Sequence, residues 1–441
     1  MQWGGSFDRF FAVNAKRYGT PFSANFPSYG KVVCFASSRA AKQLLTASPH
    51  DVHAGEAYEI LRQSAGSSSL LLLDEDEHLR MRKLLMPPLH GERLQVWREF
   101  VEMRTLQEIE AWPLREPLKL RPAMQRITLD VIMRIVFGIR DLRRAQELRG
   151  LLPVLFDVGL GQGAGYVYPW ARLDLGPRSP WGRFRRKRDR IDALLAAEIA
   201  QRRREFAAVG FAEAEQGSRE DVLSMLLVAE HDDGSRLTDA ELRDHLVTML
   251  VAGHETTATS LAWAFERLLR NSEILQRLED DLTAGSTTYL DAVIKETMRI
   301  RPVVAQIGRV LKREMTIDGW SIPAETMVML PMSLIHSDPV LYPEPEEFRP
   351  ERYLGDEELG SYVWLPFGGG VRRCIGASLA LMEMRVVITT ILRHLRLTPD
   401  RPQAEWPRAH GITLVPSRGG KVIATERLTR NLGERRGAVP A

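Results

Sequence analysis

The sequence predicts a mainly α-helical protein with minor β structure, folded as one large domain. Apolar residues recur at helical spacing over most of the 441 positions, and one such run is about 30 residues long. Strand signals are sparse and short. The 44% hydrophobic and 27% charged residues are ordinary for a globular chain. This composition excludes disorder, collagen and coiled coil for the bulk of the sequence.

Charge and cysteine content narrow the class of protein further. Sixty Lys and Arg against 57 Asp and Glu give a net charge of +3, which is not the footprint of a nucleic-acid-binding protein. The two cysteines, Cys34 and Cys374, exclude a disulfide scaffold and fit a reducing compartment. No apolar stretch approaches the ~18 residues of a membrane span, and the N-terminus lacks a signal-peptide pattern. We therefore expect a soluble, cytoplasmic protein.

The strongest helix signal covers residues 238–270. Leu242, Leu246 and Met249 begin a helical series that continues to the end of this run. Thr238 and Glu241 have the spacing of a capping box, in which each side chain satisfies a free backbone amide. Such a helix is on the order of 50 Å long, so we expect it to cross the whole molecule.

The remaining elements follow the same patterns. We predict helices over 74–86, 90–111, 121–137, 183–206, 220–230, 272–282, 287–300 and 374–395. Asp318-Gly319 between Met315–Ile317 and Trp320–Ile322 predicts a hairpin within 309–323. Short strands are expected near 326–331 and 30–35, and irregular chain over 159–182 and 339–350.

Candidate chemistry lies on both sides of the irregular stretches, so they do not separate two domains. We expect one domain over residues 1–426 and a flexible C-terminal tail over 427–441.

A glycine-rich loop carries the strongest chemical signal. It leads from Phe367 through Cys374 into an apolar-periodic helix, which places Cys374 next to a helix N-terminus. Free amides and the helix dipole there favour a thiolate and predict a lowered pKa for the Cys374 thiol. A single thiolate suits one axial bond to a haem iron, whereas zinc and iron–sulfur sites need several Cys or His ligands. Arg372 supplies a fixed cation for an anionic group.

This loop resembles the haem-binding signature of the cytochrome P450 family, Phe-x-x-Gly-x-Arg-x-Cys-x-Gly. All five fixed positions match, at Phe367, Gly370, Arg372, Cys374 and Gly376. The resemblance implies the P450 fold, a triangular prism with heme b between the long central helix and the Cys-bearing helix. It covers roughly residues 20–425 and implies that Cys374 is the metal ligand, with Phe367, Gly368 and Gly376 at the cofactor.

The resemblance also assigns roles outside the loop. Ala252, Gly253, Glu255 and Thr256 match the family's Ala-Gly-x-(Asp/Glu)-Thr stretch. Small residues at 252 and 253 let the long helix pass close over the haem, and Thr256 and Glu255 are expected to route protons in oxygen activation. His78, Arg82, Arg309 and Arg372 are expected to hold the haem propionates. Glu296, Arg299 and Arg352 correspond to a structural triad. For His336 we expect a solvated turn histidine.

These residues together imply a haem-thiolate monooxygenase that inserts one oxygen atom from O2 into a C–H bond. Its expected electron donors are a ferredoxin and a ferredoxin reductase, with docking on the Cys side through Arg80, Lys83 and Arg373. The expected pocket lining includes Met249, Ala252, Val303, Val304 and Ile412, which favours a lipophilic compound such as a terpenoid, steroid, fatty acid or polyketide. The composition looks bacterial, and we expect a monomer.

Three alternatives stay open at this point. A peroxide-driven or isomerase-type haem-thiolate enzyme shares Cys374 without needing Glu255 and Thr256. A haem-binding sensor oxidises nothing, and a basic scaffold lacks haem altogether. Other signals are set aside: His254-Glu255 lacks the second histidine of a zinc protease, and the basic run Arg183–Arg190 is interpreted as a solvated helix face.

Overall fold

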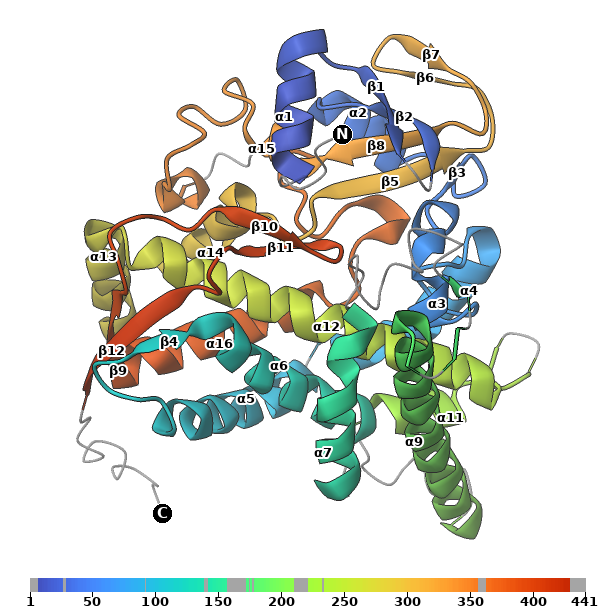
Figure 1. The fold of residues 1–441 in the computed structure, drawn as a ribbon, viewed down its shortest axis with the longest axis horizontal. Coiled ribbons are helices and arrows are strands. Elements are labelled where there is room, and N and C mark those ends of the chain that lie inside the picture. Colours follow the sequence, from blue (N-terminus) through green and yellow to red (C-terminus); the bar gives the residue numbers. More distant parts are fainter. Residues whose placement is uncertain are drawn as a thin grey trace, which may run out of the picture.

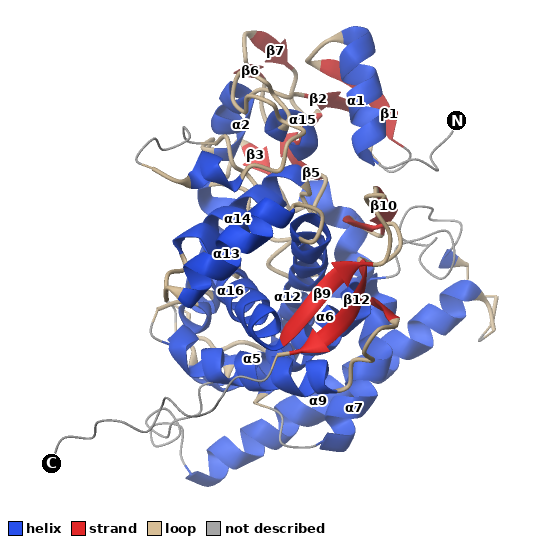
Figure 2. Ribbon diagram, turned by 90° about the vertical axis from the view of Figure 1, so that its left-hand side faces the viewer, coloured by secondary structure: helices blue, strands red, loops and turns tan. Residues whose placement is uncertain are grey.

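The helices of the chain dominate its architecture (Figures 1 and 2). The computed structural model describes residues 7–26, 29–91, 93–138, 142–156, 172–173, 175–176, 178–209, 221–231, 234–355 and 362–428. The α-helices are α1 (Phe7–Tyr18), α2 (Ser38–Leu45), α3 (Arg62–Ala65), α4 (Glu75–Leu85), α5 (Arg93–Glu110), α6 (Leu120–Phe137), α7 (Leu142–Leu151), α9 (Pro180–Val209), α11 (Val222–Val228), α12 (Asp239–Leu268), α13 (Ser272–Thr283), α14 (Thr288–Ile300), α15 (Met332–His336) and α16 (Ala377–His394). Short 3₁₀ turns cover Glu56–Leu61, Pro87–Leu89, Leu152–Phe156, Pro350–Tyr353 and Gly370–Arg372.

The strands form small sheets beside the helices. They are β1 (Phe22–Phe26), β2 (Gly30–Cys34), β3 (Val52–His53), β4 (Pro117–Lys119), β5 (Gln306–Leu311), β6 (Met315–Ile317), β7 (Trp320–Ile322), β8 (Met327–Pro331), β9 (Leu395–Pro399), β10 (Pro407–His410), β11 (Thr413–Pro416) and β12 (Lys421–Arg427). One sheet has the order β1-β2-β8-β5-β3, in which β2 and β8 are parallel. A second has the order β4-β12-β9, and β6–β7 and β10–β11 are hairpins. The first sheet and α1 lie at the top of Figure 1, above the helical part.

The predicted fold class is confirmed, and so are most of the predicted elements. The hairpin turn has positive φ at both central residues, 50° at Asp318 and 85° at Gly319, as a type I′ turn requires. The sequence analysis missed α1, α2, α3, α7, α15, β1, β3, β4 and β9–β12. These strands are short, and two of them pair with strands far away in the sequence: β4 pairs with β12, and β3 pairs with β5. The stretch expected to be irregular at 159–182 lies largely outside the described residues, as does the tail from 429 onward.

The long helix α12 begins as its sequence predicts. Thr238 caps it, and the Thr238 hydroxyl and the Glu241 carboxylate form the reciprocal bonds of a capping box. Most of its residues are buried, because the helix runs through the middle of the molecule (Figure 1).

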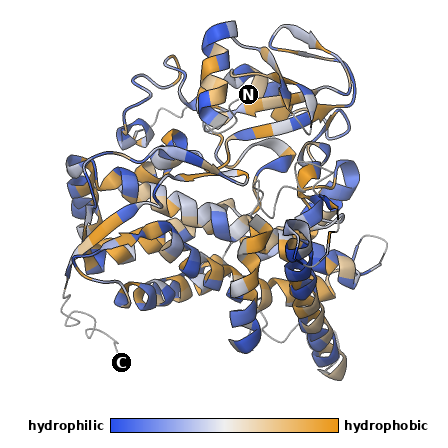
Figure 3. Ribbon diagram, in the orientation of Figure 1, coloured by the Kyte–Doolittle hydropathy of each residue, from blue (hydrophilic) through white to orange (hydrophobic). Residues whose placement is uncertain are grey.

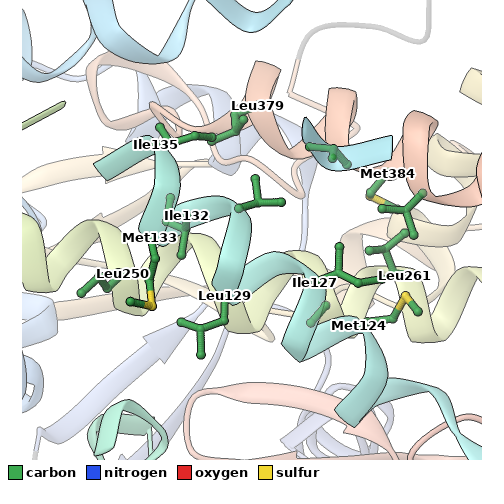
Figure 4. Packing of buried hydrophobic residues seen from close by; sticks show 14 of the residues in the cluster. Met124, Ile127, Leu129, Ile132, Met133, Ile135, Leu250, Leu261, Leu379 and Met384 are labelled. Carbon is green, nitrogen blue, oxygen red and sulfur yellow. The ribbon is translucent and has the colours of Figure 1, made fainter. Parts of the chain in front are cut away.

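The core is built where α6, α12 and α16 meet. Met124 and Ile132 of α6 lie with Leu250 and Leu261 of α12 and with Leu379 of α16 in one continuous apolar cluster (Figure 4). In Figure 3 the helices in this region carry much of the hydrophobic colour. The burial of this cluster is the main favourable contribution to folding.

Among the described residues, no helix has both the length and the apolar character needed to cross a bilayer.

Candidate functional site

The Cys374 loop lies between the 3₁₀ turn Gly370–Arg372 and the first turn of α16. The Cys374 amide donates to the Phe367 carbonyl at 2.9 Å, which closes the loop. Gly370 has φ +60°, and a Cβ there would lie 1.7 Å from the Leu45 carbonyl oxygen. A side chain at residue 370 would therefore strain the backbone and clash with the end of α2.

The environment of the Cys374 thiol differs from the one predicted. The side chain is exposed, yet nearby protein atoms desolvate the sulfur and raise its pKa. The Gly376 amide, Arg82 and Arg373 act to lower the pKa but do not outweigh this burial. The expectation of a lowered pKa from the helix N-terminus alone is wrong, because α16 begins only at Ala377 and desolvation disfavours the thiolate. A bound metal cation supplies the charge that makes a thiolate favourable.

A cluster of basic side chains lies near this loop. Burial, followed by the charges of Arg372 and Arg82, lowers the pKa of His78 to about 3. Burial also lowers the pKa of Arg309, and that of Arg372 to about 10. The sequence analysis missed Asp74, which forms an ion pair with Arg372 and accepts hydrogen bonds from the amides of residues 54–56.

One of these groups lacks a hydrogen-bond partner, and another has few. Nδ1 of His78 is buried with no hydrogen-bond partner among the described residues. The Arg309 side chain is buried, and its guanidinium donates to the Gly308 carbonyl at 2.7 Å. Buried donors without acceptors are costly, so the cluster fits a ligand that brings anionic oxygens. The carboxylates of a haem have this chemistry, and an accessible sulfur nearby suits its iron.

Arg82 lies on α4 one turn after His78 but in a different environment. The pKa of Arg82 is lowered overall. Burial is the main cause and Arg373 adds to it, whereas Cys374 acts in the opposite direction. Its side chain also lines a surface groove of about 410 Å³. Arg82 therefore lies close to Cys374 and to this groove as well as to His78.

The middle of α12 is partly exposed at the predicted stretch from Ala252 to Thr256. Ala252 is exposed and Thr256 half-buried, although most of the helix around them is buried. The Thr256 hydroxyl donates to the Ala252 carbonyl at 2.7 Å. At Gly253 an added Cβ would lie 2.9 Å from Cδ1 of Ile132. A side chain at residue 253 would therefore have to displace the end of the Ile132 side chain on α6, a contact that the sequence analysis did not anticipate.

The Glu255 side chain is buried, and its carboxylate is hydrogen-bonded to side chains of α6. Its carboxylate accepts from Arg121, and from Gln125 at 2.6 Å, both on α6. His410 of β10 lies at the far end, with Nδ1 3.3 Å from Nη2 of Arg121 and 4.0 Å from Oε1 of Glu255. Arg121, Gln125 and His410 had no signal in the sequence, because their relation to Glu255 exists only in the folded chain.

The structure brings the three triad residues together. Arg299 donates to both oxygens of Glu296, at 2.7 and 2.8 Å, and both side chains are buried. Arg352 approaches Glu296 at 3.4 Å and donates to the carbonyls of Pro343 and Glu344. The triad thus joins α14 to the chain that precedes the Cys374 loop.

Comparison with known proteins decides the family. The cytochrome P450 family model matches residues 1–424. This chain belongs to the cytochrome P450 family. Cytochrome P450 135B1 of Mycobacterium tuberculosis is 40% identical over 425 residues, which cover 94% of this chain and 86% of the relative. Cytochrome P450 138 of Mycobacterium bovis is 37% identical over 417 residues, covering 93% and 90%.

A solved structure shares the fold. The retinoic acid-bound cyanobacterial CYP120A1 has a TM-score of 0.81 and 24% identity, and the match covers 95% of this chain and 94% of that one. Family membership makes this protein a P450 monooxygenase with a cysteine-ligated haem, which uses redox partners, O2 and a small-molecule substrate.

His336 has a structural place in this P450 that its sequence context did not indicate. The expected solvated turn histidine is wrong: the side chain is 1% exposed. Its Nδ1 lies 3.1 Å from the Arg299 carbonyl, and its Nε2 accepts from the Leu365 amide at 3.0 Å. This pattern fits a neutral imidazole protonated on Nδ1. His336 therefore ties the triad to the start of the Cys374 loop.

Because burial, with the charge of Arg299, lowers the pKa of His336 to about 3, acid should destabilise this P450 through His336. The unfolded chain binds the proton below its ordinary pKa of about 6.5, whereas the folded chain does not. The free energy of unfolding should therefore fall from about pH 6.5 toward pH 3, by up to about 1.4 kcal/mol per pH unit for this one group. Urea unfolding of wild type and His336→Gln across this range tests the difference in slope. An exposed-histidine control, His50→Gln, should keep the wild-type slope; equal slopes for wild type and His336→Gln would contradict the assignment.

The predicted pocket residues come from three segments. Val304 forms an antiparallel bridge with Thr413, and the Leu414 amide donates to the Val303 carbonyl at 2.7 Å. Ile412 lies in the β10–β11 turn and is 44% exposed. The structure thus places Val303 and Val304 against this hairpin. Met249 is buried in the main core cluster, one helical turn before Gly253 on α12.

Proposed function

We propose that this P450 hydroxylates a C–H bond of a lipophilic small molecule, with heme b as the cofactor and a ferredoxin as the immediate electron donor. The observation that carries this proposal is the accessible Cys374 in a glycine loop beside the buried Arg309 and the unpartnered Nδ1 of the buried His78. When bound, the haem supplies the oxygen chemistry, and the thiolate favours O–O cleavage.

The residues favour heme b over covalently attached haem. The chain has two cysteines, far apart in sequence, so the Cys-x-x-Cys-His attachment motif is absent. A haem held without thioether bonds depends on its iron ligand and its carboxylates. Cys374 is the proposed iron ligand. His78, Arg309 and Arg372 are proposed to bind the carboxylates, with Arg82 next to them.

Thr256 and Glu255 are the proposed proton-handling residues. The Thr256 hydroxyl donates its proton to the Ala252 carbonyl of the same helix, so its oxygen retains lone pairs that can accept from water. The Glu255 carboxylate is held by Arg121 and Gln125, so it must rotate away from them to reach Thr256. The exposed Ala252 leaves room for substrate beside Thr256.

Apolar residues support the proposed substrate class. Val303, Val304 and Ile412 lie close together, and Met249 and Ala252 lie on α12. Lipophilic ligands bind where apolar side chains surround few polar groups. Terpenoids, steroids, fatty acids and polyketides all satisfy this description.

Turnover with isotopically labelled oxygen tests the function. The purified holoenzyme is supplied with ferredoxin, ferredoxin reductase and NAD(P)H, after a panel of the four compound classes has been screened for displacement of the iron-bound water. One atom of ¹⁸O from ¹⁸O2 should appear in a hydroxylated product. Product formed from peroxide but not from O2 and donor would instead support the peroxide-driven alternative.

The basic surface near Cys374 supports the proposal that a ferredoxin is the electron donor. Arg80, Lys83 and Arg373 are exposed, and Lys83 lines the groove of about 410 Å³ together with Arg82, His90 and the apolar Leu79, Met86 and Pro87. A basic surface with apolar contacts is complementary to an acidic redox protein.

Reversing these charges should slow electron transfer without removing the haem. For Arg80→Glu, Lys83→Glu and Arg373→Glu combined, we expect reduction by ferredoxin at low salt to slow about 10-fold or more. Stopped-flow measurement under carbon monoxide reads this rate, and dithionite reduction reports intact haem. Charge reversal at Lys16, which is exposed on α1 and away from α4 in Figure 1, is the matched control. An unchanged rate in the triple variant at low salt would contradict this docking surface.

A further inference from the structure

Asp74 places a carboxylate beside the basic cluster, and the chemistry proposed for this P450 does not use it. It stands at the N-cap position of α4, yet its side chain accepts no hydrogen bond from the described amides of that helix. Oδ1 instead accepts from the Ala54 and Gly55 amides, at 2.9 and 2.8 Å, and Oδ2 accepts from the Glu56 amide at 3.2 Å. The carboxylate is thus turned away from its own helix and toward the segment 54–56.

Another partner of this carboxylate is Arg372 of the Cys374 loop. Nη2 of Arg372 lies 2.5 Å from Oδ1 of Asp74, and the two side chains are only 13% and 15% exposed. The same guanidinium donates to the Leu70 carbonyl at 3.2 Å and to the Leu73 carbonyl. Arg372 is therefore held in place by one carboxylate and two carbonyls of the segment that leads into α4.

The backbone around Gly55 lies very close to the Asp74 carboxylate. A Cβ at residue 55 would lie 2.2 Å from the Leu72 carbonyl oxygen and 2.6 Å from Oδ2 of Asp74. A side chain at residue 55 would therefore require the carboxylate and the Leu72 backbone to move. The Asp74 carboxylate thus occupies a closely packed position, which the amides of the segment 54–56 and Arg372 define.

The charge of Asp74 acts on every basic group of the cluster. Burial is the main influence on the pKa of His78, of Arg309 and of Arg372 and lowers it in each case, whereas the charge of Asp74 acts on all three in the opposite direction. Because the pKa of His78 is lowered to about 3, this imidazole is neutral near pH 7. Asp74 therefore offsets part of the positive charge that Arg309 and Arg372 present to an anionic ligand.

We infer that Asp74 is an internal counter-ion of this cluster, which positions Arg372 and lowers the reduction potential of the haem. The inference rests on the proposed binding of the haem carboxylates by Arg309 and Arg372. A negative charge near the haem stabilises ferric iron over ferrous iron, and water and salt screen a largely buried charge only weakly. Asp74 also takes up part of the hydrogen-bonding capacity of Arg372, so the charge of the haem carboxylates is less compensated. Both effects favour the oxidised state.

Spectroelectrochemical titration of the full-length holoenzyme tests this role of Asp74. Asp74→Asn removes the charge but keeps an oxygen that can accept from the Ala54 and Gly55 amides. The equilibrium constant for reduction of the haem should rise on the order of tenfold, which is about 59 mV for a one-electron couple. Asp74→Glu conserves the charge but not the shape, so its potential should stay closer to that of wild type than the potential of Asp74→Asn does. A role in packing alone predicts the reverse order.

Asp76→Asn is the matched control, because it removes the same charge from the same helix. The Asp76 side chain is 74% exposed, so water and salt screen it, and the equilibrium constant should stay within about twofold of wild type. The spectrum of the reduced, carbon monoxide-bound form of each variant verifies the thiolate ligand. A wild-type potential in Asp74→Asn, or an equal shift in Asp76→Asn, would overturn the inference and leave the proposed function intact. Loss of haem from Asp74→Asn would also overturn it, because Asp74 would then be needed for packing. A wild-type holoenzyme that contains another type of haem would instead count against the proposed function.

Discussion

Replacement of Cys374 by serine is expected to abolish the red-shifted Soret band of the reduced, carbon monoxide-bound protein. That band reports ligation of the iron by a thiolate, and a serine hydroxyl is neither soft nor readily deprotonated. Oxygen-dependent hydroxylation should fall by a factor on the order of 100 or more, which is about 2.7 kcal/mol of activation free energy. Absorbance spectra and product formation measure the two effects.

Cys34 provides the matched control for this experiment. It is fully buried in β2, and burial raises the pKa of its thiol to about 12. Cys34→Ala removes a thiol without touching the loop at residue 374, so the band and the turnover should survive. A shifted band that persists in Cys374→Ser and disappears in Cys34→Ala would refute the assignment of the ligand.

Removal of the Glu296 carboxylate is expected to have the largest effect on stability. Burial acts to lower the pKa of Arg299, yet the hydrogen bonds and charge of Glu296 raise it above its ordinary value. In Glu296→Ala the acceptors left to the buried guanidinium among the described residues are the carbonyls of His336 and Glu347, and neither carries a charge. A buried charge left without its partner costs about 3–5 kcal/mol, which should appear as a lower urea midpoint and reduced haem content.

A surface ion pair provides the comparison for Glu296→Ala. Arg313 pairs with Asp51 at 2.7 Å, but its side chain is 65% exposed. Arg313→Ala should change the free energy of unfolding by less than about 1 kcal/mol, because water solvates the remaining partner. If Glu296→Ala unfolds at the same urea concentration as wild type, Glu296 does not hold the triad together.

Several features of this protein follow from short stretches of sequence. The capping box at Thr238 and Glu241 and the Asp318-Gly319 turn formed as predicted, because each depends on residues that are neighbours in the chain. The Cys374 loop and the family are likewise set by local spacing, since a ligand and its glycines must lie within one turn.

Other features depend on residues that meet only after folding. Asp74 beside Arg372, and Arg121 with His410 around Glu255, are separated by more than 100 positions and have no local pattern. His336 is also buried by packing from distant segments. This burial lowers the pKa of its imidazole, whereas the sequence predicted a solvated turn histidine.

The sequence by itself determined the family, the candidate iron ligand and the long helix, because periodicity and motif spacing are properties of consecutive residues. Only the tertiary structure decided the pKa of the Cys374 thiol, the partners of Glu255 and the burial of His336. Desolvation and ion pairing depend on which atoms surround a group in space, and the order of residues in the chain does not specify that.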